Sequence, residues 1–245
     1  MKIVFLLIAF VGAGLLGAVQ PATGLPTEIL QLTQFGPALG VAVVVLFWPA
    51  QVKALLAGAF GGRGGTRTGL ALAATAVVVV TGAAAAYGLI GGDASPTMPQ
   101  HSLLVIAVAQ FVGACGEEIG WRCFLQPAVR TQWGVLASST AVGLIWGLWH
   151  VPVFAEGWAY ATAFVVATVS MSIVLGVALD GVRAHRLWLA GTFHTLVNLA
   201  MLLFMDEESG AVVPMTLLAA TCAVAAVGWL ASRATSMPRV ESQAG

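Results

Sequence analysis

Three charged side chains lie within six positions of one another in a chain that otherwise avoids charge. Glu117 and Glu118 are adjacent in the stretch GACGEEIGWRCFLQP, and Arg122 follows four residues after the second glutamate. On a helix, a carboxylate and a guanidinium at positions i and i+4 share a face and can pair. The pair of Glu118 and Arg122 accounts for two of the charges. Glu117 has no evident cation in its own helix, and such intramembrane carboxylates usually serve a function.

Two other apolar segments carry polar side chains that can join Glu117 in a site. The segment GLIWGLWHVPVF contains His150, with Trp146 four residues before it. The segment GTFHTLVNLA contains His194 and Asn198, which are i and i+4 and can face one cavity. One histidine in an apolar helix is often only a packing residue. Two histidines, an asparagine and a surplus glutamate on three segments favour a functional site.

The elements that must hold these residues are predicted to be transmembrane helices. The chain has 245 residues, 59% of them hydrophobic and 8% charged, with a mean hydropathy of +0.95. Apolar runs of about 20 residues recur along it, as a bilayer requires of a helix. The sequence predicts an all-α polytopic membrane protein with one bundle in residues 1–231 and a disordered cytoplasmic tail in 232–245. The eight predicted spans are 2–20, 36–52, 69–91, 102–125, 135–156, 159–179, 186–205 and 211–231.

The first predicted span has two readings. Lys2 precedes an apolar stretch, as in a cleaved signal peptide. The stretch is longer than a usual signal core and no clean A-x-A site ends it, so a retained helix is the favoured reading.

The distribution of charge predicts the orientation in the membrane. Formal net charge is zero, which gives no indication of nucleic-acid binding. With eight spans, the basic residues outside the opening motif fall on one side, and most acidic residues fall on the other. Positively charged loops stay cytoplasmic, so both termini are expected in the cytoplasm. The Ala-, Val- and Gly-rich composition favours a bacterial cytoplasmic membrane. The basic residues are Lys2, Lys53, Arg63, Arg67, Arg130, Arg183, Arg186, Arg233 and Arg239.

The three polar segments resemble the motifs of the CPBP family, the CAAX proteases and bacteriocin-processing enzymes, also called the ABI family. EEIGWR fits the family pattern E-E-x-x-x-R, and HTLVN fits H-x-x-x-N. WGLWH fits F-x-x-x-H with Trp146 in place of Phe. The motifs occur in the family's order over roughly residues 113–200, with a family core expected at about 102–205. One departure is Cys123, where the family commonly has Gly.

The resemblance implies an intramembrane endopeptidase related to the type II CAAX prenyl endopeptidase. In that reading, Glu117 and His150 activate a water molecule, and His194 and Asn198 stabilise the oxyanion. Supporting roles fall to Glu118, Arg122 and Trp146, with Arg122 holding Glu118 in place. The expected partners are the lipid bilayer and a peptide or membrane-protein substrate; the sequence does not predict the oligomeric state.

Two alternatives stay open. A zinc ion held by Glu117, His150 and His194 would serve the same reaction, but the H-E-x-x-H arrangement is missing, so no cofactor is favoured. A non-catalytic immunity or partner-binding protein would keep the same fold, and a proton-coupled carrier is a more distant option. The complete set of motif residues favours the enzyme.

Overall fold

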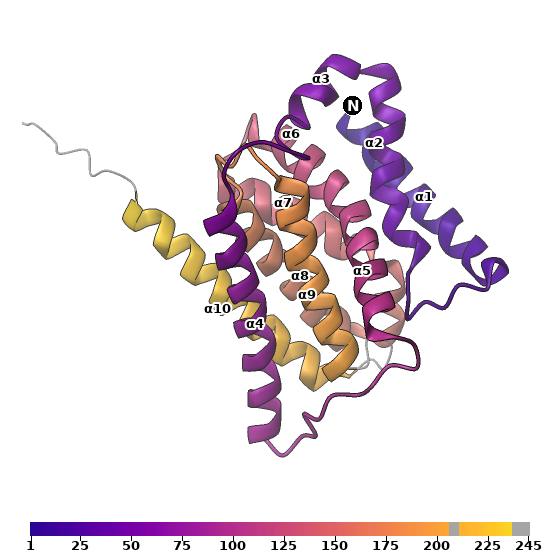
Figure 1. Cartoon of the computed structure of the whole chain (residues 1–245), viewed down its shortest axis with the longest axis vertical. Coiled ribbons are helices and arrows are strands. Elements are labelled where there is room, and N and C mark those ends of the chain that lie inside the picture. The colour runs from indigo at the N-terminus through magenta and orange to yellow at the C-terminus, as the bar shows by residue number, and fades with distance from the viewer. Residues whose placement is uncertain (206–210, 237–245) are drawn as a thin grey trace, which may run out of the picture.

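The computed structural model describes residues 1–205 and 211–236, and every regular element in that part of the chain is helical (Figure 1). The predicted fold class, a polytopic helical membrane protein, is thereby confirmed. The predicted acidic loop at Asp206, Glu207 and Glu208 lies outside the described residues. The elements are α1 (Lys2–Thr23), η1 (Leu32–Phe35), α2 (Gly36–Phe47), α3 (Pro49–Leu55), α4 (Thr66–Leu89), α5 (Leu103–Glu118), η2 (Ile119–Leu125), α6 (Gln126–Arg130), α7 (Val135–Trp149), η3 (Val151–Glu156), α8 (Trp158–Ala178), α9 (Arg186–Phe204) and α10 (Val212–Ser236).

Six helices in the described part of the chain are long and apolar enough to cross a membrane. These are α1, α4, the continuous run from α5 through α6, α8, α9 and α10. The last of them continues to Ser236, five residues past the predicted end of its span, and the rest of the predicted tail is outside the described residues. The other two predicted spans are helical over shorter lengths, for reasons that the sequence contains.

The second predicted span, 36–52, is wrong as a single helix. It ends at Phe47, and Trp48 leaves the helical conformation with φ −134° and ψ 54°. Pro49 then begins α3. Proline excludes the helical conformation from the residue before it, and its own φ suits the first position of a new helix. With 12 residues, α2 is about 18 Å long, well short of a hydrocarbon core of about 30 Å.

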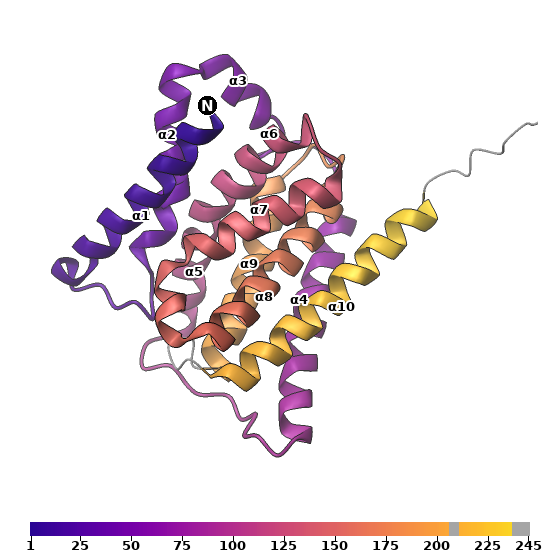
Figure 2. The same cartoon turned by 180° about the vertical axis from the view of Figure 1, so that it is seen from behind.

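The fifth predicted span, 135–156, is also too long. The α-helix ends at Trp149, and η3 continues the chain as a 3₁₀ helix. Pro152 is the physical reason, because it has no amide hydrogen to donate and disfavours the helical conformation of the preceding residue. His150 therefore caps the end of α7 and does not lie inside a long helix. Figure 2 shows α7 running obliquely across the bundle.

Small residues on α5 and η2 let the N-terminal helices approach closely. A methyl group at Gly120 would meet the ring of Pro37 on α2, and one at Gly116 would meet Phe35. Phe5 of α1 is fully buried in this contact, with its ring centroid 5.7 Å from that of Trp121. Close backbone approach at small residues is a common basis of helix association in membranes. The N-terminal helices α1 and α2 thus pack closely against the segment that carries the charged motif.

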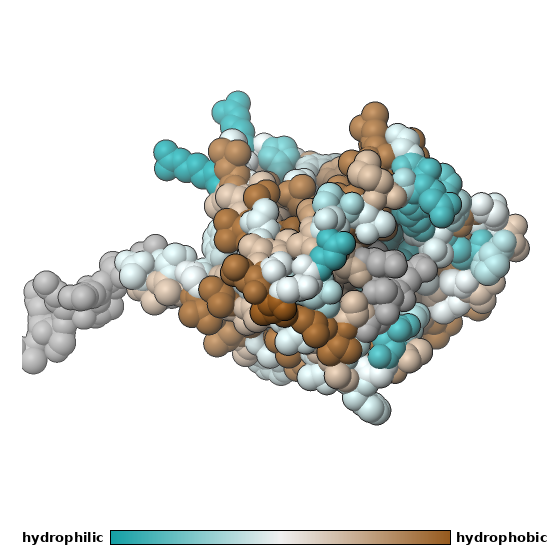
Figure 3. Space-filling view, turned by 90° about the horizontal axis from the view of Figure 1, so that it is seen from below, coloured by the Kyte–Doolittle hydropathy of each residue, from teal (hydrophilic) through white to brown (hydrophobic). Residues whose placement is uncertain are grey.

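The basic side chains gather at one end of the bundle. Lys2 donates to Gln132 at 3.1 Å, and Asp180 binds Arg130 at 2.9 Å and Arg233 at 2.6 Å. Burial opposes the charged form of Asp180, but the hydrogen bonds from the two arginines outweigh it and lower the pKa of this carboxyl. These contacts bring the start of α1, α6, the loop after α8 and the end of α10 together. The opposite end mixes hydrophilic and hydrophobic side chains (Figure 3).

The close approach at Gly120 predicts a loss of stability when it is filled. Gly120→Ala should destabilise the protein by about 1–3 kcal/mol, the usual cost of overpacking a tight contact. Gly228→Ala is the matched control, since a methyl group there meets nothing within 4 Å. Unfolding of the two variants in mixed micelles measures the difference. Equal stability would show that α1 and α2 do not pack on η2 as described.

Candidate active site

Glu117 is buried near the end of α5, where it contacts α7. Glu117 is only 2% exposed. One carboxylate oxygen, Oε2, accepts a hydrogen bond of 2.8 Å from the indole nitrogen of Trp146. A hydrogen bond to a charged acceptor is about twice as strong as a neutral one. Glu117 thus has a defined orientation towards α7, as a catalytic carboxylate needs.

Glu118, the adjacent carboxylate, contacts α9 and η2. It is fully buried, and its Oε1 lies 2.9 Å from Nδ1 of His194. Its Oε2 lies 3.3 Å from Nε of Arg122. Those last two atoms form an ion pair without hydrogen-bond geometry, since neither has a hydrogen-bond partner within the described structure. The predicted pairing of Glu118 with Arg122 is therefore present, and His194 is a second partner.

Arg122 lies on η2, a π-helix that directly follows Glu118. Such wider turns are rare, and they occur often at functional sites. The guanidinium carbon of Arg122 lies 4.4 Å from the ring centroid of Trp146. A cation over an indole face is attracted by the ring, more strongly where water is excluded. Trp146 therefore contacts both a carboxylate and a cation of the opening motif.

The two ring nitrogens of His150 have different roles. Its Nδ1 lies 2.9 Å from the carbonyl oxygen of Trp146, so Nδ1 must carry the proton and donate. In the neutral ring, Nε2 is then a free acceptor. The ring is packed edge-on against Trp149, with centroids 4.9 Å apart, and against Phe164 at 4.8 Å. This geometry makes His150 suited to hold or deprotonate a water molecule.

His194 is arranged the same way, but beside a carboxylate. Because Glu118 accepts from Nδ1, a neutral His194 presents an acceptor at Nε2, and only the imidazolium presents a donor there. The ring centroid of His194 lies 5.1 Å from that of Trp146. His194 can therefore act as an oxyanion donor in its charged form.

Asn198 contacts a residue that the sequence analysis did not single out. Its Nδ2 donates to Oε1 of Gln110 at 3.3 Å. Gln110 is buried on α5, seven residues before Glu117, which places both on one helical face. A glutamine in an otherwise apolar helix was the signal available. The second hydrogen of the Asn198 amide is left for another acceptor.

The structure brings Glu117, His150 and His194 together around Trp146. Glu117 and His194 both lie within electrostatic reach of His150. In the described part of the chain, no three His, Cys, Asp or Glu side chains are arranged to hold a metal ion. Both Nδ1 atoms are hydrogen bonded to protein oxygens, which leaves Nε2 of each ring for a proton, a water molecule or a metal ion.

The site also lies in a segment that matches a known protein family. A family model described as "Type II CAAX prenyl endopeptidase Rce1-like" matches residues 99–200. That segment contains all three polar motifs in order. This segment is similar to the CPBP, or CAAX protease, family that the three motifs resemble.

The chain is also similar to curated proteins from Staphylococcus aureus. The chain is 27% identical over 129 residues to lysostaphin resistance protein A of strains bovine RF122 / ET3-1, Newman and USA300. The match covers 51% of this chain and 30% of each relative. The chain thus spans less than a third of the length of these relatives. The similarity therefore concerns a part of those proteins and not the whole of them.

The hydrogen bond from Trp146 to Glu117 predicts a measurable loss when its donor is removed. Trp146→Phe keeps an aromatic ring but leaves a buried carboxylate oxygen without its partner. We expect a loss of about 1.5–3 kcal/mol of unfolding free energy, as for bonds to charged groups. Trp149→Phe is the matched control, because its indole donates to a neutral carbonyl, Ala9 O, at 3.1 Å. A loss in Trp146→Phe no larger than in the control would contradict the described contact.

Proposed function

We propose that this chain is an intramembrane endopeptidase that hydrolyses a peptide bond with water activated by Glu117 and His150. The observation that carries the proposal is the convergence of Glu117, His150 and His194 around Trp146 inside an apolar helical bundle. Ionisable residues buried in a membrane bundle usually mark a functional site. The family match to a CAAX endopeptidase model supports the same reaction class. The proposed substrate is a peptide or protein segment that reaches this site from within the bilayer.

The first step is deprotonation of water. Water donates to the free Nε2 of His150 and to the carboxylate of Glu117, which accepts the proton as general base. The hydroxide attacks the carbonyl carbon of the scissile peptide, and the carbonyl oxygen becomes an oxyanion. Glu117 then returns the proton to the leaving amine as the carbon–nitrogen bond breaks. The products are a carboxylic acid and an amine, and no other reactant is consumed.

The second requirement is stabilisation of the oxyanion. His194 as imidazolium donates from Nε2, and Glu118 holds the ring through Nδ1. The free amide hydrogen of Asn198, one helical turn from His194, is the second proposed donor. Glu118 and Arg122 act through their contacts with these residues and not on the substrate. The proposed step uses the acid–base chemistry of these side chains alone.

Removal of the Glu117 carboxylate tests the function. Glu117→Gln retains the shape of the side chain but cannot accept a proton, so cleavage should fall by about 10²–10⁴-fold, the usual contribution of a general base. Glu156→Gln, at the exposed end of η3, is the matched control and should cleave normally. Quantitative proteomics of cells carrying each variant identifies peptides that remain uncut. Normal processing in the Glu117→Gln cells would reject the proposed mechanism.

Metal dependence has its own test. The purified protein should keep its activity under strong chelation, and elemental analysis should find far less than one zinc ion per chain. Stoichiometric zinc that disappears together with activity in His150→Ala would instead identify a metallopeptidase with rearranged ligands.

A second candidate function is a non-catalytic resistance or immunity protein. The observation in its favour is the name of the relatives, which refers to lysostaphin resistance and not to a peptidase. A non-catalytic protein would keep its effect on cells in the Glu117→Gln variant. Loss of both cleavage and cellular effect in that variant would support the enzyme.

We also propose that the basic end of the bundle faces the cytoplasm, with both termini there. A cysteine replacing Arg67 should then react with an impermeant thiol reagent only after permeabilisation. A cysteine replacing Asp93, in the loop between α4 and α5, should react in intact cells. The wild-type protein gives the background of Cys115, Cys123 and Cys222. The reverse pattern would overturn the orientation.

A further inference from the structure

A cavity of about 370 Å³ lies at the basic end of the bundle, between α3, the η2–α6 segment and the loop that joins α8 to α9. Small-molecule sites commonly occupy about 300–1,000 Å³. The charged side chains in its wall are four arginines and one aspartate, a formal sum of +4 − 1 = +3. These residues are Arg122, Arg130, Arg183, Arg186 and Asp180.

The inner end of the cavity is formed by Arg122, whose hydrogen-bonding capacity is not used. The residue is 2% exposed, and none of its three guanidinium nitrogens has a hydrogen-bond partner within the described structure. Within the described residues, its charged partner is Glu118, through the ion pair at Nε. Buried donors without acceptors are costly, and native proteins rarely keep them without a reason. The two unpaired terminal nitrogens of Arg122 therefore indicate that an acceptor binds them from the cavity.

Acidic side chains compensate the charges of the remaining arginines only in part. Asp180 is already bound by Arg130 and by Arg233, so it does not neutralise the rest of the wall. Arg186 donates only to the backbone carbonyls of Leu55 and Ala57, and its buried Nε has no partner in the described residues. A guanidinium bound to neutral carbonyls retains its full charge. The cavity is thus an open region of positive potential.

We propose that this cavity binds the phosphate group of an anionic phospholipid. Arginine forks bind phosphate oxygens with paired hydrogen bonds, and several arginines around one cavity suit an anion with more oxygens than a carboxylate. The apolar part of the wall, which includes Leu55, Leu175 and Leu179, can pack on the glycerol and the first methylenes of such a lipid. Basic pockets between membrane helices on the cytoplasmic side commonly hold anionic head groups. The cavity shares Arg122 with the proposed catalytic group, but the binding of a phosphate there is not a step of the proposed peptide hydrolysis.

Lipid binding to the whole purified protein tests this site. The protein is exchanged from detergent into nanodiscs of phosphatidylcholine with or without phosphatidylglycerol, and native mass spectrometry counts retained lipids. We expect preferential retention of phosphatidylglycerol. Arg183→Gln should weaken it about fivefold, which corresponds to the roughly 1 kcal/mol expected for one arginine near an anionic surface. Arg183 is exposed at the mouth of the cavity, so its replacement should leave folding intact.

The matched control is Arg67→Gln, which removes the same charge from an exposed position outside the cavity wall. It should leave retention unchanged. A second variant, Ala57→Glu, places a carboxylate at the exposed part of the wall and should weaken retention at least as much as Arg183→Gln. Thermal unfolding of each variant in neutral detergent verifies that it is folded before lipid is added.

The outcomes separate the possible occupants. Inorganic phosphate that stabilises the protein, with no preference between the two lipids, would keep the phosphate chemistry and assign it to a free ion. Equal retention of both lipids together with no effect of phosphate would overturn the proposal. So would equal losses in Arg183→Gln and Arg67→Gln, or competition by a peptide with a free C-terminal carboxylate but not by lipid. Peptidase activity is not a readout, so failure here leaves the proposed function untouched.

Discussion

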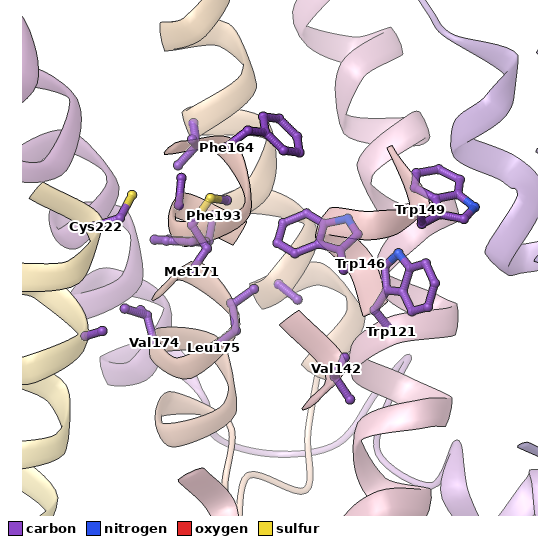
Figure 4. Packing of buried hydrophobic residues seen from close by; sticks show 14 of the residues in the cluster. Trp121, Val142, Trp146, Trp149, Phe164, Met171, Val174, Leu175, Phe193 and Cys222 are labelled. Atoms are coloured by element: carbon purple, nitrogen blue, oxygen red, sulfur yellow. The ribbon is translucent and has the colours of Figure 1, made fainter. Parts of the chain in front are cut away.

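Two adjacent buried carboxylates determine how three helices meet in this protein. Successive residues on a helix point about 100° apart, so Glu117 and Glu118 cannot serve the same neighbour. Glu117 accepts from Trp146 on α7, and Glu118 binds His194 on α9. Each carboxylate is buried and must be matched by donors. The positions of α7 and α9 relative to α5 follow from that requirement, together with the apolar packing around Trp146 shown in Figure 4.

The same contacts give the two histidines complementary chemistry. Both rings donate through Nδ1, His150 to a neutral backbone carbonyl and His194 to a carboxylate. A ring beside a neutral acceptor is suited to remain a base at Nε2, whereas a ring beside a carboxylate is suited to carry a charge and donate. Trp146 orients Glu117 with a donor that phenylalanine, the residue in the family pattern that this chain resembles, does not have. The indole is thus a departure with a physical consequence for Glu117.

Much of this arrangement could be predicted from the residues, because the signals were local. Apolar runs of sufficient length predicted helices, and the i, i+4 spacing predicted the ion pair of Glu118 with Arg122. Pro49 and Pro152 lie in apolar runs that otherwise continue. The length of those runs therefore predicts spans that are longer than the helices, which end before these prolines. The π-helix at 119–125 and the bond between Asn198 and Gln110 depend on packing between distant segments. No local pattern in the sequence specifies them.

The basic cavity is formed by three segments that are far apart in the sequence. Arg122 connects it to the buried group of Glu117, Glu118 and His194. With His194 charged, the buried group contains two carboxylates and two cations, so it is neutral without any further ion. An anion that approaches the free face of Arg122 adds a negative charge to this balance. The arginines at 130, 183 and 186 lie in the same wall and compensate for it. Arg122 can therefore hold Glu118 on one side and accept an anion on the other, without leaving an unbalanced charge inside the membrane.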